Sequence, residues 1–445
     1  MTRSHRRRLV AAIAALSLPL AVSACTGDSG GGPEDNPDAE TTITFWHGWS
    51  ADSEVAAIQA TIDAFEDANP NVHVKVVGGI TDDKINQALR AGGPQAPDVV
   101  SSFTTDNVGQ FCSSGAFADL TPFMADSDID PASTFPPAQL EYTQYEGNQC
   151  ALPLLSDAYG LYYNKDAFAA AGIDGPPTTM SEFDADAVKL TKTSGDTYSQ
   201  LGFMPTYHGY ESSITHLVAQ WSPTYFTADG ASNVGSDPAF AQAMEWQKGL
   251  VDKLGGYSKL EKYRSTFGDE WGAKNPFMTG QVAMAIDGEW RAGMIEADAP
   301  DLNFGVAPFP VPDDQADTYG KGYITGTIVG IASTSKKQNA AWKFVQYLAT
   351  DTDAVVNFAN AIHNVPSTTG ALASPDVNQD EATQEFIAIA SNPASNTTPA
   401  SPNGGAYQLT LQDFGYAYES GKETDLQGGL SGVASQIDTD IAQSK

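Results

Sequence analysis

The sequence has little positive charge, and this shortage argues against whole classes of partner. Its 445 residues include 23 Lys and Arg but 55 Asp and Glu, which gives a formal net charge of −32. Such a field repels phosphate backbones and anionic lipid head groups, and it gives small anionic substrates no electrostatic steering. We therefore expect no nucleic-acid binding and favour a neutral ligand. The same charge keeps an exported chain soluble and favours a monomer.

Motifs for metals and cofactors are also missing. The six histidines show no metal-binding spacing, and neither a phosphate loop nor a dinucleotide-binding glycine motif occurs. Asp126, Asp128 and Asp130 imitate the start of a calcium loop, but Pro131 and Pro137 stand where that loop requires Gly and Glu. The sequence therefore predicts no metal site and no cofactor.

Long apolar runs are confined to the N-terminus. The run from Leu9 to Val22 follows a basic stretch, is too short to span a bilayer, and predicts a signal peptide over residues 1–24. Small residues before Cys25 resemble a bacterial lipobox, which predicts a lipidated Cys25 that anchors the protein to the outer face of the cell membrane. An ordinary signal peptide with a coincidental cysteine is the alternative, and both Sec and twin-arginine export stay open. Residues 25–40, rich in Gly, Pro, Ser and acids, predict a flexible tether.

Cysteine is scarce in the rest of the chain, where only Cys112 and Cys150 occur. An exported chain meets an oxidising compartment, so we expect these two residues to form a disulfide. Two free buried thiols are the alternative.

The length and the 41% hydrophobic content are enough for a sizeable core and favour two domains. Ile43 to Trp46 predicts a strand, and apolar residues at helical spacing from Asp52 to Asn69 predict a helix. Alternation between Val72 and Val76 predicts a second strand. Strand, helix and strand in this order indicate a parallel pair and an α/β fold.

Five segments in a fixed order then carry a resemblance to a known family. They are TTITFWHGWS, APDVVSSFTTDNVGQF, ALPLLSDAYGLYYNKDAF, GQVAMAIDGEWR and TGTIVGIASTSKKQNAAWKFVQYLATD. Together they resemble the extracellular solute-binding protein family 1, to which maltose-binding protein belongs. The likeness implies a lipoprotein that binds a sugar, closes by hinge bending and delivers the sugar to the permease of an ABC import system.

The resemblance also implies a domain organisation. We expect a two-lobed periplasmic-binding-protein-like α/β fold of class II, with mixed sheets flanked by helices and a central ligand cleft. The first lobe would hold residues 41–151 and 303–356, and the second would hold residues 152–302 and 357–445. Hinge closure requires a ligand that binds the closed state better than the open state.

Sugar chemistry and the resemblance together predict the site. A pyranose offers apolar C–H faces to aromatic rings and a rim of hydroxyls to polar side chains. In relatives, the turn that matches Gly288 to Trp290 presents a stacking tryptophan, whereas Trp246 and Trp342 lie on helical patterns and are predicted to be core. The predicted ligand-binding residues are Trp46, His47, Trp49, Asp106, Asp157, Tyr159, Tyr207, His208, Trp221, Trp271, Gly288, Glu289, Trp290, Arg291 and Thr325.

Parts of the sequence are also compatible with other functions. A glycerol phosphodiester, a polyol or an iron complex could replace the sugar, and Tyr162 with Tyr163 would then be the candidates for iron. Asp287 and Glu289 could serve a secreted glycoside hydrolase, but alternate residues of an extended segment face opposite ways. An adhesin or signalling receptor could share the fold. Residues 391–405 match no family motif and predict either a cleft rim or a surface loop.

Overall fold

The computed structural model describes residues 39–93 and 96–444. The predicted signal peptide, the lipidated Cys25 and almost all of the predicted tether lie outside the described residues. Within the described ranges, no helix has both the length and the apolar character needed to cross a membrane.

The first strand, helix and strand form as the sequence predicts. Strand β1 (Thr41–Trp46) leads into helix α1 (Asp52–Ala68) and strand β2 (Val72–Val77). β1 and β2 pair in parallel with Thr41 opposite Val72, so the predicted strand–helix–strand crossover is confirmed. The connecting helix α1 buries one apolar face through Ile58, Ile62 and Phe65.

One mixed sheet organises the molecule. Its strand order is β10-β6-β11-β3-β1-β2, and both β12 and β9 also pair with β6. β1 pairs in parallel with β2 and β3, whereas β11, β12, β9 and β10 all pair antiparallel with their neighbours. The further strands are β3 (Val99–Ser102), β6 (Leu152–Asn164), β9 (Met284–Gly288), β10 (Phe304–Ala307), β11 (Ile324–Ile331) and β12 (Val365–Pro366).

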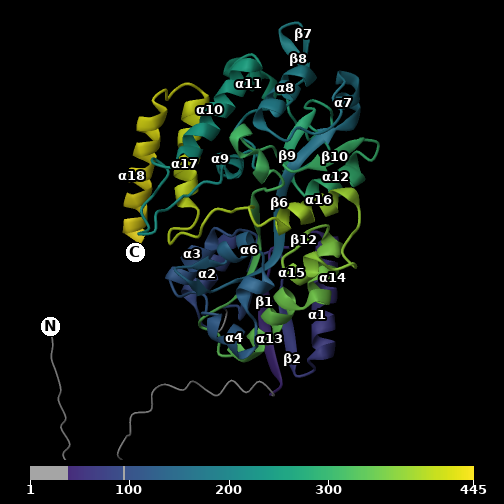
Figure 1. Cartoon of the computed structure of the whole chain (residues 1–445). Coiled ribbons are helices and arrows are strands. Elements are labelled where there is room, and N and C mark those ends of the chain that lie inside the picture. The colour runs from purple at the N-terminus through teal and green to yellow at the C-terminus, as the bar shows by residue number, and fades with distance from the viewer. Residues whose placement is uncertain (1–38, 94–95, 445) are drawn as a thin grey trace, which may run out of the picture. The chain divides into compact units, whose positions relative to one another are not determined.

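Strand β6 connects two groups of strands (Figure 1). Its first half, as far as Ala158, pairs with β11, and β12 pairs with the same half. Its second half, from Tyr159 onward, pairs with β9 and β10. The sequence predicts that this segment crosses between lobes, and its pairing on both sides fits that role. The pairing also places β10 with the second group, just beyond the predicted boundary at residue 303.

Two buried clusters stabilise these groups. The first centres on Phe45, Phe65 and Phe344 and includes apolar faces of helices α13 (Gln338–Thr350) and α14 (Thr352–Ile362). The second cluster takes in helices α8 (Met180–Leu190), α10 (Pro238–Lys253), α17 (Ala406–Glu419) and α18 (Leu426–Ser444), of which α17 and α18 lie side by side (Figure 1). Burial of apolar surface in such clusters is the main favourable term in folding.

Shorter elements complete the chain. Two small hairpins are β4 (Gln144–Tyr145) with β5 (Asn148–Gln149), and β7 (Lys192–Ser194) with β8 (Thr197–Gln200). The remaining helices are α2 (Asp82–Ala91), α3 (Asn107–Ser113), α4 (Thr121–Asp126), α5 (Pro131–Thr134), α6 (Pro137–Glu141), α7 (Lys165–Ala171), α9 (Ile214–Val218), α11 (Tyr257–Arg264), α12 (Trp290–Asp298), α15 (Thr369–Leu372) and α16 (Glu381–Ser391). Two 3-10 helices span Ala219–Trp221 and Asp313–Thr318.

The two predicted core tryptophans lie on helices. Trp342 on α13 is buried, and its indole Nε1 donates a hydrogen bond to the Ser127 hydroxyl at 2.9 Å. Trp246 on α10 is half-buried, and its Nε1 donates to Asp184 at 3.0 Å. Each ring therefore contributes packing area while its polar atom finds a partner, as expected for tryptophans in a core.

Cys112 and Cys150 form the predicted disulfide. The bridge joins α3 to the residue after β5, and the two Cα atoms lie 5.8 Å apart. That separation is within the range of ordinary disulfides. The bridge therefore ties the β4–β5 hairpin to α3.

Removing this disulfide should lower stability substantially. The bridge closes a loop with a sequence separation of 38, for which the chain-entropy model gives about 4 kcal/mol. We expect the double variant Cys112→Ser, Cys150→Ser to lose free energy of unfolding of this order in urea titrations. Dithiothreitol should lower the wild-type midpoint and leave the double variant unchanged. Equal wild-type stability with and without the reductant would contradict the prediction.

Candidate functional site

Six aromatic side chains from distant parts of the chain meet beside β6, and we name them the aromatic wall: Tyr159, Tyr210, His216, Trp271, Trp290 and Tyr323. At its open end, Trp271 and Trp290 stack with centroids 6.2 Å apart. The Tyr210 ring lies 5.9 Å from the Trp271 ring. Tyr210 and Trp271 are 50% and 46% exposed, so this end of the wall offers free ring surface to a ligand.

The other end of the aromatic wall is buried. Tyr159 lies edge-on to Trp290 at 5.6 Å and packs against His216 at 4.6 Å. His216 in turn stacks on Tyr323 at 4.4 Å. Burial lowers the pKa of His216 to about 3, so the ring is neutral at physiological pH. The wall therefore carries no positive charge of its own from histidine.

Two polar atoms of the wall are buried without a protein partner. The Tyr159 hydroxyl and the Trp290 Nε1 have no hydrogen-bond partner among residues 39–93 and 96–444. Buried polar atoms are nearly always paired, and an unpaired one costs about 1–3 kcal/mol. A ligand with hydroxyl groups could satisfy both atoms.

A pair of acids lies at the base of the wall. Glu289 Oε2 accepts a hydrogen bond from the Ala158 amide at 3.0 Å, and Asp157 Oδ1 accepts one from Asn364 at 3.1 Å. Burial raises the pKa of Asp157 to about 6. Burial, followed by the nearby Asp157, raises the pKa of Glu289 well above its usual range. Both carboxyls are therefore easier to protonate than ordinary acids, and their oxygens can accept hydrogen bonds from a bound hydroxyl.

A buried ion pair between Asp287 and Arg291 lies on either side of Glu289 in the sequence. Arg291 Nε contacts Asp287 Oδ2 at 2.6 Å, and the guanidinium lies 5.9 Å over the Trp271 ring. Burial is the main cause that raises the pKa of Asp287 to about 6, and Arg291 opposes it. Because Asp287 pairs with Arg291 and Glu289 faces Asp157, these two acids have separate partners. Separate partners do not favour the two carboxyls flanking one bond that glycoside hydrolysis uses.

Gly288 shapes the turn between these acids. A Cβ atom built on Gly288 would lie 2.3 Å from the Trp290 ring, so only glycine lets the ring fold back over the backbone here. The Tyr162 hydroxyl donates to the Gly288 carbonyl at 2.9 Å and supports the same turn. Tyr163 packs against Phe168 instead, at 4.9 Å. The two tyrosines considered for iron are therefore used in packing, and the described residues hold no cluster of three or more metal-binding side chains.

A cavity of about 520 Å³ adjoins the aromatic wall. Gly209 and Glu211, the neighbours of Tyr210, line it, as do Glu270 and Asp287. Glu211 is only 6% exposed, and its Oε1 has no partner within the described part of the chain. Burial, reinforced by Asp287, raises the pKa of Glu211 to about 8. We name this space the acidic cavity.

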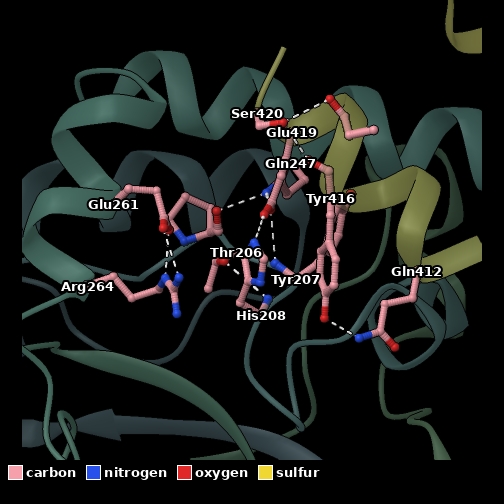
Figure 2. A network of polar contacts seen from close by, with 12 residues as sticks. Thr206, Tyr207, His208, Gln247, Glu261, Arg264, Gln412, Tyr416, Glu419 and Ser420 are labelled. Carbon is pink, nitrogen blue, oxygen red and sulfur yellow. Dashed lines mark hydrogen bonds and ion pairs between the residues drawn. The ribbon is translucent and has the colours of Figure 1, made fainter. Parts of the chain in front are cut away.

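Two predicted ligand residues belong to a polar network behind the acidic cavity (Figure 2). His208 Nε2 contacts Glu419 Oε1 at 3.0 Å, and its ring stacks on Tyr416 at 4.0 Å. Glu419 Oε2 accepts hydrogen bonds from the Tyr207 amide and from Gln247. Burial raises the pKa of Glu419 to about 7. His208 therefore lines the cavity while it ties this loop to α17, and Tyr207 is buried beside it.

These acids give the stability of the protein a definite pH dependence. The folded state holds protons on Glu211 and Glu419 that the unfolded state releases near its lower pKa, so this stabilisation is present at low pH and lost as pH rises through about 7 and 8. We expect the free energy of unfolding to fall by about 2 kcal/mol between about pH 6.5 and about pH 8.5. Above about pH 6.5 the buried histidines, whose pKa values are lowered, no longer oppose this trend.

Urea titrations of the wild type and of Glu211→Gln would measure this dependence. The neutral amide cannot ionise, so the variant should lose about half of the decrease with pH and keep the share that Glu419 contributes. A wild-type stability that is flat or rises over this interval would contradict the assigned protonation of the cavity.

Three predicted residues lie at or just after the end of β1. Trp46, the last residue of β1, is half-buried and packs against the second cluster, which also contains Tyr159. Trp49 is 2% exposed and lies edge-on to Phe103 and Phe358 in the first cluster. His47 is buried beside Trp49, and burial lowers its pKa to about 4. Within the described ranges, no ring contact links His47 or Trp49 to the wall.

Asp106 and Thr325 lie where the two groups of strands meet. Thr325 on β11 is opposite Asp157 on β6, and its hydroxyl lies 3.1 Å from that of Thr105. Asp106 accepts a hydrogen bond from the amide of Gln408 on α17. Burial raises the pKa of Asp106. Thr325 is therefore next to the acid pair, while Asp106 is engaged by the C-terminal helices.

The loop over residues 391–405 lies where the two groups of strands meet and contacts both sides. Its residue Asn396 pairs with Tyr323 of the aromatic wall, and Thr398 bonds the Tyr323 hydroxyl at 2.9 Å. Farther along, the carbonyl oxygen of Ser401 would lie 2.2 Å from a Cβ atom on Gly109 of α3. The loop therefore connects the wall to α3.

The aromatic wall contains residues that the sequence interpretation did not name. Tyr210, His216 and Tyr323 belong to the wall, although none lies in a family motif. Tyr210 is close in sequence to His208, and Tyr323 is two residues before Thr325, but only the tertiary fold brings them together. Trp221 is 7% exposed and packs on Trp246 at 5.6 Å.

Comparison with known proteins identifies the class. A family model described as bacterial extracellular solute-binding protein matches residues 60–385. The chain therefore belongs to the bacterial extracellular solute-binding proteins, and its fold is the two-lobed α/β fold of that class.

Particular relatives share this assignment. A binding protein of Brucella abortus (strain 2308) is 31% identical over 206 residues, which are 46% of this chain and 47% of the relative, so the match spans about half of that protein's length. The diacetylchitobiose binding protein DasA of Streptomyces coelicolor is 27% identical over 354 residues, 78% of this chain and 79% of the relative. The structure of CpMnBP1 with mannotriose bound superposes with a TM-score of 0.72 at 25% identity and covers 88% of this chain and 99% of that one.

Proposed function

We propose that this protein is the extracellular substrate-binding lipoprotein of an ABC import system and that it binds a carbohydrate, an oligosaccharide, at the aromatic wall. The proposal rests on one observation: exposed aromatic rings lie next to buried polar atoms that have no partner in the described residues. Trp271 and Tyr210 offer ring surface, and the Tyr159 hydroxyl and Trp290 Nε1 are buried without partners among the described residues. Sugars present matching C–H faces and hydroxyls.

The acids beside the wall fit this ligand. The carboxyl oxygens of Asp157 and Glu289 can accept hydrogen bonds from sugar hydroxyls. The single arginine at the wall, Arg291, is already paired with Asp287 at 2.6 Å, which weakens the case for a phosphate ligand. The names of DasA and of the mannotriose complex likewise support a saccharide.

We propose a binding role without catalysis, and the partners of the two acids support it. Asp287 pairs with Arg291 and Glu289 accepts from the Ala158 amide, so each acid is already engaged separately. Family membership supports the same conclusion, because the matched model describes solute-binding proteins. We therefore propose that the protein binds and releases its ligand unchanged.

Location and partners complete the proposal. Signal cleavage before Cys25 and lipidation of that residue would hold a monomer at the outer face of the membrane, next to its permease. The lobes would follow the boundaries given above, with residues 41–151 and 303–356 in one lobe and the rest in the other. The change of partners within β6, between Ala158 and Tyr159, supports a crossing between lobes in this segment.

Ligand-dependent thermal stability tests the proposed function. The mature protein would be heated with mono- and oligosaccharides, polyols, glycerol phosphodiesters and ferric complexes in turn. A ligand at 100 times its dissociation constant should stabilise the folded state by about 2.7 kcal/mol and raise the melting temperature. We expect an oligosaccharide to do so. A shift with a phosphodiester or ferric complex alone would contradict the substrate class, and cleavage of a saccharide would contradict the binding role.

A further inference from the structure

The acidic cavity has a charge pattern that a neutral sugar does not use. Its lining includes the acids Glu211, Asp269, Glu270 and Asp287, and two basic side chains, Arg264 and His208, the second of which contacts Glu419. Arg264 is held by Glu261 through two hydrogen bonds, of 2.6 and 2.8 Å. Asp287 is the partner of Arg291, and Asp269 accepts a hydrogen bond from the Trp271 amide. Glu211 and Glu270 have no ion-pair partner in the described part of the chain.

Glu211 is the feature that points to a ligand rather than to a solvated acidic surface. It is 6% exposed, and its Oε1 is buried without a partner in the described residues, so water does not solvate it. Leaving such an oxygen unpaired costs free energy that a bound donor would recover. The charged groups that act on Glu211 are Asp287 on β9, Glu270 in the loop after α11 and Arg291 on α12, and two of these three are acids.

The position of the cavity decides which donor can reach it. Glu211 follows Tyr210, Glu270 precedes Trp271, and both rings form the exposed end of the aromatic wall. A saccharide ring on Trp271 would therefore place one substituent in the acidic cavity. A bare divalent cation is a poor alternative, because no three metal-binding side chains converge within residues 39–93 and 96–444.

We infer that the acidic cavity binds the protonated amine of an amine-bearing saccharide, with Glu211 as the residue that recognises the ammonium group. The inference rests on the proposed function and narrows its substrate class. Glu211 would accept a hydrogen bond from the ammonium group, and Glu270 would add electrostatic attraction. The exposed rings of Tyr210 and Trp271 would hold the sugar ring and the cation near it.

Binding of the amine has a proton signature. Because the pKa of free Glu211 is about 8, the carboxyl is mostly protonated at pH 7. The arriving positive charge favours the carboxylate, so the carboxyl loses its proton to the buffer while the ammonium keeps its own. Up to about one proton should therefore be released for each ligand that arrives in its ammonium form.

Calorimetric titration of the mature protein in two buffers of different ionisation enthalpy measures both affinity and proton release. The probes would be a β-linked glucosamine disaccharide with free amines and its N-acetylated counterpart. We expect the free amine to bind at least about tenfold more tightly, since a charge-assisted hydrogen bond contributes about 1.5–3 kcal/mol. Proton release should accompany the free amine alone.

Two variants make the test specific. Glu211→Gln keeps the shape of the side chain and should lose both the preference for the amine and the proton release, while it still binds the N-acetylated sugar. Glu141→Gln alters an acid that lines a different cavity and should change neither. Equal affinity of the wild type for both sugars, or a preference that survives Glu211→Gln, would overturn the inference and leave the proposed function standing. Failure of every saccharide to bind the folded wild type would overturn both.

Discussion

Replacing Trp290 with alanine should weaken saccharide binding about 100-fold, which corresponds to about 2.7 kcal/mol. The Trp290 ring joins the two ends of the aromatic wall, because it stacks with Trp271 at 6.2 Å and lies edge-on to Tyr159 at 5.6 Å. Its Nε1 is buried without a partner in the described residues and could donate to a sugar hydroxyl. The truncation therefore removes ring surface and a hydrogen-bond donor together.

Isothermal titration with the best saccharide of the thermal screen would measure the loss. Trp290→Phe keeps an aromatic face but not the indole N–H, so it should retain part of the affinity. Trp246→Phe alters a half-buried tryptophan of the second cluster and should leave affinity unchanged. Wild-type affinity in Trp290→Ala, with unfolding of the free protein also unchanged, would show that the wall is not the binding site.

Replacing Gly109 on α3 with valine should weaken saccharide binding at least about tenfold, because the larger side chain would push the loop over residues 391–405 away from α3 and oppose closure. The contact joins the two predicted lobes. A Cβ atom on Gly109 would lie 2.2 Å from the Ser401 carbonyl oxygen, and Gln408 donates to Asp106 next to it. The atoms in contact are backbone atoms of Gly109 and Ser401, so no flexible side chain can move aside. Gly109→Val should therefore force the loop away from α3.

Small-angle scattering with and without saccharide would report closure directly. The wild-type radius of gyration should fall when the ligand binds, and that of Gly109→Val should fall less. Gly249→Ala provides a matched control, because Gly249 lies on α10 where an added Cβ meets no atom within 4 Å. Unchanged affinity and unchanged compaction in Gly109→Val would contradict a role of this contact in closure.

Local sequence patterns were sufficient for the elements that form from neighbouring residues. The parallel pair of β1 and β2 follows from valine alternation and helical spacing, and the segment of β6 is indicated by its resemblance to the family's segment that crosses between lobes. The motif around Gly288 to Trp290 likewise predicts a turn with a tryptophan, and the structure places that ring in the aromatic wall. In these cases the residues that decide the structure are close together in sequence.

The rest of the candidate site depends on contacts that local patterns do not contain. Tyr159 meets His216 and Tyr323 only because β6, α9 and β11 come together in the fold. Conversely, Trp49 follows a strand end as a ligand residue would, yet it is buried between Phe103 and Phe358. Burial and pairing across the sheet decide which aromatic residues reach the site, and both are tertiary properties.

A crystal structure of the mature protein with the tightest-binding saccharide tests the central claim most directly. The account predicts one sugar ring on Trp290 and Trp271, hydroxyls within hydrogen-bond distance of the Tyr159 hydroxyl and of Asp157, and α3 in contact with the loop over residues 391–405. A saccharide bound elsewhere, for example in the second cavity beside the β4–β5 hairpin, would contradict it.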